Sequence, residues 1–317
     1  MKSKAILIAT RGSELALAQA NQVLAQCRKT FPKLVFELKI LKTSGDKFLT
    51  ASLSNPDPSL PKGLFTKELE IALLKGRADL AVHSLKDLPT ELPEGLKLGA
   101  VAGPRADVRD VLIYKKPLAP GLKLAQLPSG LTVATSSMRR TAQLLALRPD
   151  FKVEEIRGNV ATRLRKLAEQ AGLDATILAA AGLGRLRFRI TAAGRLTGGE
   201  VPDGLRAMML DTDEMLPCVG QAAIGLEIRA DDEQAASLCR ELNDEATFQC
   251  VTAERALLRA LGGGCQMPIG AHATLTGTEL HLRAVSFLQD KVRRAEASGA
   301  VSDAAGLGER VAAQLKL

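Results

Sequence analysis

Residues 131–180, LTVATSSMRRTAQLLALRPDFKVEEIRGNVATRLRKLAEQAGLDATILAA, alternate runs of strand length with amphipathic stretches. The amphipathic stretches follow Ser137 and Asn159, residue types that cap helices, and they end near Pro149 and Gly172. The runs of strand length are Leu131–Thr135, Lys152–Ile156 and Asp174–Ala180. Strands separated by helices predict a parallel α/β sheet.

The same alternation occupies the first hundred residues and restarts near residue 105, so we expect two α/β lobes. The expected segments of the first lobe are strands at Ala5–Ala9, Phe36–Ile40 and Asp79–His83 and helices at 13–29 and 66–75. After Ala230, two helices, a hairpin around Gly277 and a final helix from about Asp303 predict a smaller α+β domain. Residues 44–63 are expected to form a long loop, and residues 194–216 a loop with a short helix.

The composition favours an anionic partner and argues against two kinds of binding surface. The 317 residues carry a formal net charge of +8. Eight Phe, one Tyr and no Trp are too few rings to stack single-stranded nucleic acid, and no basic run forms a tail. The longest uncharged stretch, Ala260–Thr278, contains three consecutive glycines and a proline. We therefore expect no nucleic-acid partner and no membrane span.

The cysteines and histidines favour reduced thiols and no metal site. Five cysteines without a CxxC motif are typical of a cytoplasmic protein. The three histidines, His83, His272 and His281, are too widely spaced to suggest a ligand set. The short apolar run at the N-terminus lacks a cleavage site, so it predicts a first strand and not a signal peptide.

Hydroxyl, amide and basic residues recur where the expected strands end. The segments are Thr10–Ser13, Ser84–Asp87, Ser136–Arg140 and Arg157–Asn159, with Arg185 following the next strand. Strand ends of α/β sheets bind ligands, and helix N-termini with arginine favour anions, carboxylates above all. A single such arginine is more often a surface or ion-pair residue. Their recurrence predicts a site for an anionic ligand.

Two residue types leave alternatives open at this point. Asp87 is either a counter-ion for Lys86 or a nearby arginine, or a carboxylate that stabilises a developing cation. Cys265, in a glycine-rich loop, and Cys218, in Pro217–Gln221, could each be a reactive thiol or an inert buried one. His83, at a strand end, favours a structural role over a catalytic one.

Eight segments together resemble the porphobilinogen deaminase family. They are IATRGSELALAQA, KGLFTKELE, RADLAVHSLKDLP, ATSSMRRTAQL, RGNVATRLRKL, ILAAAGLGRL, VGQAAIGLE and TAERALLRALGGGCQMPIG, in the family's order from Ile8 to Gly270. The resemblance implies an α/β fold of two lobes with doubly wound sheets, like two-lobed (type II periplasmic-like) anion-binding proteins, plus a smaller C-terminal α+β domain. The implied domains are 1–102 with 223–242, 103–222, and 243–317.

The resemblance also implies a transferase of tetrapyrrole biosynthesis. It would join four porphobilinogen molecules head to tail, release ammonia at each step and free hydroxymethylbilane, as a cytoplasmic monomer. Its cofactor would be a covalent dipyrromethane, assembled from porphobilinogen and bound to Cys265 through a thioether, which favours Cys265 over Cys218. A carboxylate near the pyrrole nitrogens would lower the barrier to the azafulvenium-like cation, and Asp87 matches the family's acid.

The other implied site residues match the family's motifs one by one. The implied catalytic residues are Asp87, Lys86 and Arg11. The residues implied to bind the cofactor are Cys265, Asp87, Lys86, Ser84, Thr135, Ser136, Ser137, Arg139, Arg140, Arg157 and Gly158. The residues implied to bind substrate are Arg11, Ser13, Lys62, Arg157, Arg163, Arg185 and Gln221.

The sequence departs from the family's pattern at three places. Pro61 replaces a Gly-Gly before Lys62, residues 196–214 look like an insertion, and the family's PAVGQGA is PCVGQAA, with Cys218 and Ala222 as the differences. Two other classes of function stay under consideration. A two-lobed protein that binds a small anion without catalysis would not need Cys265, and a nucleic-acid binder would show steep salt dependence.

Overall fold

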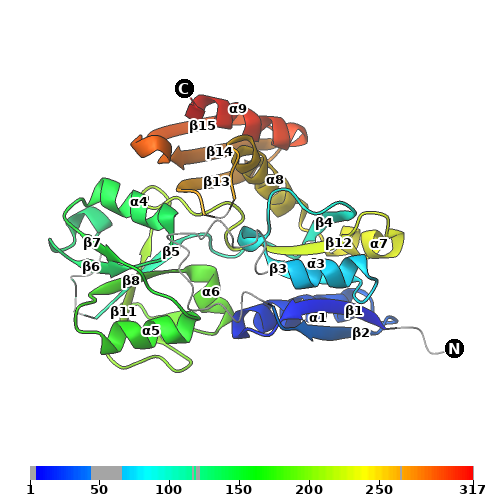
Figure 1. Ribbon diagram of the computed structural model, residues 1–317, viewed down its shortest axis with the longest axis horizontal. Coiled ribbons are helices and arrows are strands. Elements are labelled where there is room, and N and C mark those ends of the chain that lie inside the picture. Colours follow the sequence, from blue (N-terminus) through cyan, green and yellow to red (C-terminus); the bar gives the residue numbers. More distant parts are fainter. Residues whose placement is uncertain (1–4, 44–65, 116–117, 119–121, 265, 317) are drawn as a thin grey trace.

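The computed structural model describes residues 5–43, 66–115, 118, 122–264 and 266–316. The chain forms two lobes side by side and a third part that packs above them (Figure 1). Each of the three parts is built on a sheet of its own. The expected fold class, two α/β lobes and a smaller α+β domain, is confirmed. The exact domain boundaries stay a prediction.

The first lobe has a five-stranded sheet with helices on both faces. Its strand order is β2 (Phe36–Leu41), β1 (Ile6–Arg11), β3 (Leu80–Ser84), β12 (Ile224–Arg229) and β4 (Leu96–Val101). Helices α1 (Glu14–Thr30) and α7 (Glu233–Leu242) cover one face, and α3 (Lys67–Leu74) covers the other. The chain therefore returns to this lobe for β12 and α7 after it has built the second one.

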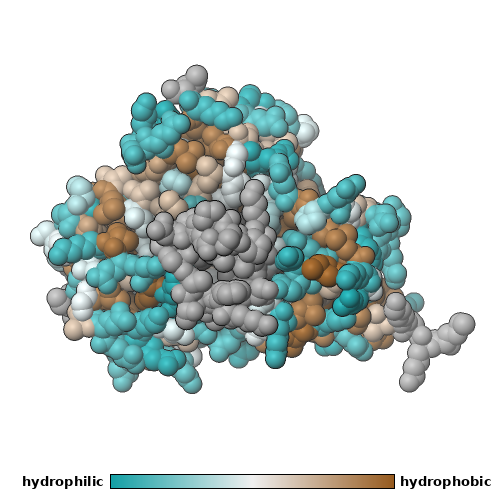
Figure 2. All heavy atoms as spheres, in the orientation of Figure 1, coloured by the Kyte–Doolittle hydropathy of each residue, from teal (hydrophilic) through white to brown (hydrophobic). Residues whose placement is uncertain are grey.

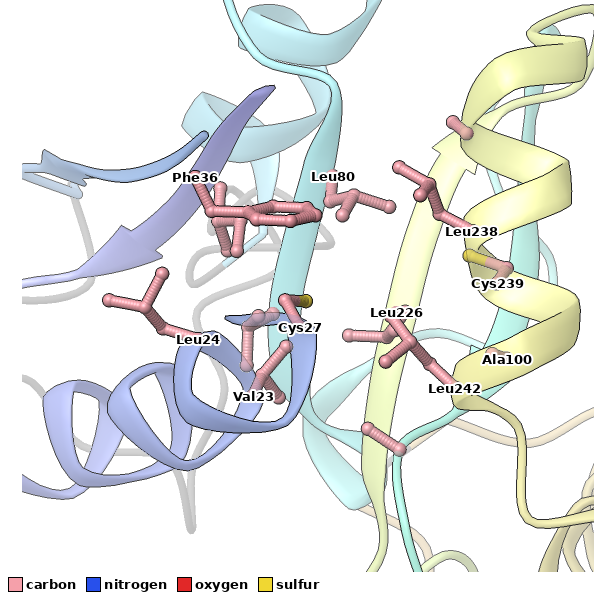
Figure 3. Packing of buried hydrophobic residues seen from close by; sticks show 14 of the residues in the cluster. Val23, Leu24, Cys27, Phe36, Leu80, Ala100, Leu226, Leu238, Cys239 and Leu242 are labelled. Atoms are coloured by element: carbon pink, nitrogen blue, oxygen red, sulfur yellow. The ribbon is translucent and has the colours of Figure 1, made fainter. Parts of the chain in front are cut away.

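Helix α1 forms where the sequence predicts it, because its capping residue and its apolar face both favour a helix over these residues. Ser13 Oγ accepts a hydrogen bond from Ala16 N (3.4 Å) as the N-cap. Side chains from α1 and α7 converge on the sheet residues Leu80 and Leu226 (Figure 3). The helix residues in this contact are Val23, Leu24 and Cys27 of α1 and Leu238, Cys239 and Leu242 of α7.

The second lobe repeats this plan with different helices. Its strand order is β11 (Arg206–Leu210), β5 (Asp110–Tyr114), β8 (Ala175–Ala179), β6 (Thr132–Ala134) and β7 (Lys152–Glu154). Helix α4 (Met138–Leu147) packs on one face through Leu144, and α5 (Val160–Glu169) packs on the other through Leu164 and Leu167. Short α6 (Ala180–Arg185) follows β8.

The third part is an antiparallel sheet with two helices. Strands β13 (Ile269–Thr276), β14 (Glu279–Ser286) and β15 (Arg293–Ala300) pair in sequence order, and the predicted hairpin lies between the first two. Helices α8 (Glu245–Ala260) and α9 (Ala304–Lys316) pack against each other and against this sheet. Short 3-10 turns occur at Leu85–Asp87 (η1), Leu124–Gln126 (η2), Leu288–Asp290 (η3) and Val301–Asp303 (η4).

Two expectations about the sheets were wrong in part. The sheets are mixed and not purely parallel, because one described strand in each lobe runs against its neighbours: β12 in the first and β5 in the second. Each is the first strand after the chain crosses from the other lobe, without the helical crossover that makes neighbouring strands parallel. Residues 194–216 contain β10 (Leu196–Thr197), paired with β9 (Arg189–Ile190), and β11, instead of a loop with a short helix.

The visible surface of all three parts carries large hydrophilic areas (Figure 2). Within the described residues, no helix is both long enough and apolar enough to cross a membrane.

Candidate active site

In the first lobe, the predicted site residues lie at the carboxyl ends of β1 and β3. Arg11 is the last residue of β1, and η1 carries Lys86 and Asp87 directly after β3. Lys86 is half-buried and Asp87 is exposed. Among the residues that the structure describes, the Asp87 carboxylate has no hydrogen bond or ion pair. The Asp87 carboxylate is therefore available to interact with a positively charged group of a bound ligand.

The η1 turn is held in place by the chain that returns to the first lobe. Leu85 N donates to Ala223 O (3.0 Å), and the Leu85 and Leu88 side chains are buried beside Ala223. A Cβ at Gly220 would lie 3.3 Å from Lys86 N, so the glycine permits this close approach. Before the turn, Ser84 Oγ is hydrogen-bonded to the Gln19 amide of α1. The backbone of Lys86 and Asp87 is thus held by a hydrogen bond and apolar packing on Leu85 and by the hydrogen bond of Ser84 to α1.

In the second lobe, Arg139 and Arg140 lie in the first turn of α4 and are both buried. Ser137 Oγ caps the helix by accepting from Arg140 N (3.4 Å). Both guanidinium groups donate to Asp110, Arg139 at 2.8 Å and Arg140 at 2.7 Å. Burial alone would raise the pKa of Asp110, but the two arginines outweigh it and hold that pKa far below its usual value. Asp110 therefore neutralises part of this arginine pair.

Sequence reasoning missed Asp110. It stands at the start of the strand β5, directly before the apolar run Val111–Tyr114. A lone acid in front of a buried strand is the signal that could have indicated a buried counter-ion. Gln221, predicted to bind substrate, is fully buried and donates to Asp110 (3.0 Å) and to Val108 O (2.6 Å), so its described contacts belong to this network.

Arg157 and Arg163 follow the next strand, β7, and their charges are balanced less completely. Arg157 Nε donates to Glu155 (2.9 Å), whereas the hydrogen bond of Arg163 goes to a carbonyl, Gly158 O (2.8 Å). Burial, followed by repulsion from Arg140 and Arg157, lowers the pKa of Arg163 to about 10. These three arginines therefore form one group with an excess of positive charge, which a bound anion would relieve.

The turn between β7 and α5 explains why a glycine precedes this helix. Gly158 has φ +116°, and a Cβ there would lie 2.6 Å from Thr162 Cγ2. Asn159 then caps α5 by accepting from Thr162 N (2.8 Å). On the neighbouring strand, Thr135 N donates to Glu154 O and Ser136 Oγ to Ile156 O (2.5 Å). These predicted cofactor-binding residues thus line the same two strand ends.

The two lobes meet at α1 and α6, which lie close together (Figure 1). A Cβ at Gly182 would lie 3.9 Å from Leu15 Cδ2. Arg185, the last residue of α6, donates to Ala222 O (2.6 Å), and burial lowers its pKa. The structure therefore brings the end of β1, with Arg11 and Ser13, to the same side of the molecule as Arg185.

A second buried acid, Glu254 of α8, joins the third part to the two segments that connect the lobes. It forms a two-fold hydrogen-bonded ion pair with Arg105 (2.7 and 3.0 Å). It also accepts from Gly220 N (2.8 Å) and from Ala273 N in β13 (2.9 Å). Sequence reasoning missed Arg105 and Glu254 as well, because their partners come from segments far apart in the chain.

The described cysteines differ in their surroundings. Cys27, Cys239 and Cys250 are buried, and burial raises their pKa values to about 11, 12 and 11. Cys218 is half-buried and donates to Gln221 Oε1 (3.3 Å). Cys265 and Lys62, both predicted site residues, lie outside the described residues. Just before Cys265, a Cβ at Gly263 would lie 2.2 Å from Met267 Sδ, so the Met267 side chain packs closely against this glycine.

His83 lies in the core of the first lobe. Its Nε2 is 2.9 Å from Glu227 Oε2, and both side chains are buried. Within the described part of the chain, no group of three or more His, Cys, Asp or Glu is placed to hold a metal ion.

The structure is that of an α/β protein with a strongly basic site. Arginines lie at the strand ends of the second lobe, and an exposed carboxylate lies at a strand end of the first lobe. Two family models match it: "Porphobilinogen deaminase, dipyromethane cofactor binding domain" over residues 6–237, and "Porphobilinogen deaminase, C-terminal domain" over residues 248–317. The chain belongs to the porphobilinogen deaminase family.

Curated relatives agree over nearly the whole chain. The porphobilinogen deaminase of Moorella thermoacetica is 46% identical over 98% of this chain and 92% of its own length. That of Syntrophobacter fumaroxidans is 44% identical, with 99% and 95% covered. Among solved structures, the sulphonate-binding protein SsuA of Escherichia coli is 14% identical with a TM-score of 0.39, covering 82% of this chain and 71% of SsuA. The BenM effector-binding domain with benzoate is 18% identical with a TM-score of 0.43, covering 76% and 90%.

Proposed function

We propose that this protein is a hydroxymethylbilane synthase, a transferase that joins four porphobilinogen molecules head to tail and releases ammonia at each step. Its membership of the porphobilinogen deaminase family supports the reaction class. The structural observation that carries the proposal is the excess positive charge on Arg140, Arg157 and Arg163. Each porphobilinogen brings an acetate and a propionate, so a growing chain of pyrroles accumulates the negative charge that such a group attracts.

The family's cofactor fits the residues of the second lobe. Arg140 Nε is buried and has no hydrogen-bond partner within the described part of the chain, so a donor remains for a carboxylate. When bound, dipyrromethane supplies the free pyrrole α-carbon to which the first substrate unit is joined. We propose Cys265 as its thioether attachment. The residues proposed to hold its side chains are Lys86, Ser84, Thr135, Ser136, Ser137, Arg139, Arg140, Arg157 and Gly158.

The proposed role of Asp87 is to stabilise positive charge on the incoming substrate. The C–N bond of the protonated aminomethyl group of porphobilinogen breaks, ammonia leaves with the electron pair of that bond, and an azafulvenium-like cation remains. A carboxylate near the pyrrole nitrogen lowers the energy of that cation. The bound cofactor would supply the nucleophilic α-carbon that takes up this cation, and the proton displaced from that carbon would balance the reaction. Asp87 is suited to this role because its carboxylate is exposed and unpaired within the described residues.

Basic residues from both lobes are proposed to orient the substrate carboxylates. Lys86 and Arg11 lie at strand ends of the first lobe, and we assign them to catalysis with Asp87. The residues proposed to bind substrate are Arg11, Ser13, Lys62, Arg157, Arg163, Arg185 and Gln221. The buried contacts of Gln221 make it the weakest member of this set, since it would act through the backbone that it holds.

Turnover of porphobilinogen by Asp87→Ala tests the proposal. Hydroxymethylbilane formation and ammonia release should fall about 100- to 1,000-fold while the variant stays folded, because one stabilising charge is lost in the transition state. The matched control is Glu91→Ala, which removes an exposed acid in the same segment and should leave turnover unchanged. Wild-type protein that forms no hydroxymethylbilane would contradict the proposed function. Normal turnover in Asp87→Ala would contradict the role of Asp87 alone.

We further propose that the protein is a cytoplasmic monomer whose partner is the small-molecule substrate. The odd number of cysteines supports a reducing compartment. Light scattering on the eluting protein should give the mass of one chain, 33.6 kDa plus the cofactor.

A further inference from the structure

The segment after Asp87 is bound by a helix of the third part. Arg255 of α8 donates through Nη1 to Leu88 O (3.0 Å) and through Nη2 to Pro89 O (2.6 Å). One guanidinium group therefore holds two consecutive carbonyls. Next to this contact, Thr90 Oγ1 donates to Gly263 O (3.5 Å), in the loop that follows α8. Three hydrogen bonds thus join the segment 88–90 to α8 and to its C-terminal loop.

Apolar packing supports the same contact. Leu85 and Leu88 are buried beside Val251 of α8, on the helical turn before Arg255. Lys86, Leu88, Arg255, Leu258 and Gly264 line one cavity of about 10 Å3, which has room for about one water. The turn that carries Asp87 and the end of α8 are therefore close neighbours with little space to shift.

Helix α8 leads directly into the loop that contains Cys265. The helix ends at Ala260, and Gly263 N donates to Leu258 O (3.0 Å) as the loop begins. Any group attached in this loop is thus anchored to the same helix that holds the backbone of Leu88 and Pro89. A change in that hold would alter the place of Asp87 relative to the attached group.

We propose that Arg255 is a positioning residue, which fixes Asp87 relative to the end of α8. This inference rests on the proposed function. Arg255 acts through the backbone of the segment 88–89, because it donates hydrogen bonds to both of these carbonyls. A planar guanidinium group can donate hydrogen bonds to two adjacent carbonyls at once, which an ammonium group does less well. Misplacement of a reacting group by about 1 Å can cost about 100-fold in rate.

The test compares Arg255→Ala with Arg259→Ala in the cofactor-loaded enzyme. Arg259 lies one turn further on α8, is exposed and pairs only with Glu309 across 3.8 Å among described residues. In Arg255→Ala, kcat should fall about 10- to 100-fold while KM stays close to wild type. Amide hydrogen exchange in the segment 85–92 should speed up, and intact mass should show the cofactor still attached. Arg259→Ala should change none of these quantities.

Arg255→Lys gives a graded measurement in a side chain that keeps its charge. Its kcat and its exchange rate in the segment 85–92 should lie between those of wild type and Arg255→Ala, and it carries the test if Arg255→Ala does not fold. Wild-type kcat in a folded, loaded Arg255→Ala (or, failing that, Arg255→Lys) would overturn the proposal. So would a fall in kcat with unchanged exchange. Either result would leave the proposed function standing, since that is judged on the wild type.

Discussion

Two pairs of arginines in the second lobe differ in what balances their charge. One pair is Arg139 and Arg140, in the first turn of α4. The other is Arg157 and Arg163, which follow the neighbouring strand β7. The first pair shares the buried carboxylate of Asp110. In the second pair, burial, followed by repulsion from Arg140 and Arg157, lowers the pKa of Arg163. Both pairs lie between a strand end and the first turn of the capped helix that follows it. The same local pattern therefore builds the lobe in one place and leaves positive charge for a ligand in the other.

Asp110→Asn should have the largest effect on stability, because it leaves two buried guanidinium groups without their counter-ion. We expect the free energy of unfolding to fall by about 3–5 kcal/mol. Denaturant unfolding measures this loss. Asp107→Asn is the matched control, because its pair with Arg109 is exposed and should contribute no more than about 1 kcal/mol. A loss of that small size in Asp110→Asn would remove the difference between the two arginine pairs.

The contribution of Asp110 should also disappear in acid. Its pKa is far lower in the folded protein than the usual 3.8, so the unfolded chain takes up the proton first as the pH falls. Its stabilisation is therefore complete above about pH 5 and is lost below about pH 4, by up to about 1.4 kcal/mol per pH unit. Denaturant unfolding of wild type and Asp110→Asn at several pH values should show that the difference between their free energies of unfolding becomes smaller as the pH falls below about 5. A constant difference would contradict the buried charge.

Arg163→Met should act on substrate and hardly on stability. Removing one charged donor should raise KM for porphobilinogen about 10- to 100-fold. The free energy of unfolding should change by less than about 1 kcal/mol, since the lost bond to Gly158 O is offset by relief of repulsion from Arg140 and Arg157. Arg165→Met, on an exposed position of α5, is the control for both quantities. Unchanged KM in Arg163→Met would mean that the excess charge does not serve the substrate.

Ala222→Gly should give the smallest effect, and in the stabilising direction. Ala222 has φ +72° in the turn that holds Gln221, and through it Asp110. This conformation strains a residue with a Cβ, so glycine should raise the free energy of unfolding by about 0.5–1 kcal/mol. Ala223→Gly, at a buried neighbour outside the left-handed region, should lower it instead. A loss of stability in both variants would mean that Ala222 is not strained.

The sequence predicted helices and strands well where the hydrophobic periodicity and the capping residues indicated the same element. Ser13, Ser137 and Asn159 all cap helices as expected. The direction of β5 and β12 could not be predicted, because an apolar run has the same pattern whichever way it pairs. The partners of Arg139 and Arg140 were hidden for a similar reason. Asp110 lies 29 and 30 residues away, and only the folded sheet brings the three together.

The family's motifs predict which residues belong to the site, but the local surroundings of those residues needed the structure. Gln221 belongs to a matching motif, yet its contacts are buried and support Asp110. Glu254 lies on helix α8, and it binds Arg105, Gly220 and Ala273 from three separate segments. Such networks depend on burial, which residue type and spacing alone do not determine.

The intact mass of the purified protein, with peptide mapping around Cys265, tests the central claim most directly. We predict an added mass of two linked pyrrole units on the peptide that contains Cys265. The addition should persist in Cys218→Ser and be absent from Cys265→Ser. A chain that stays unmodified after incubation with porphobilinogen, or one that carries the addition on Cys218, would contradict this account.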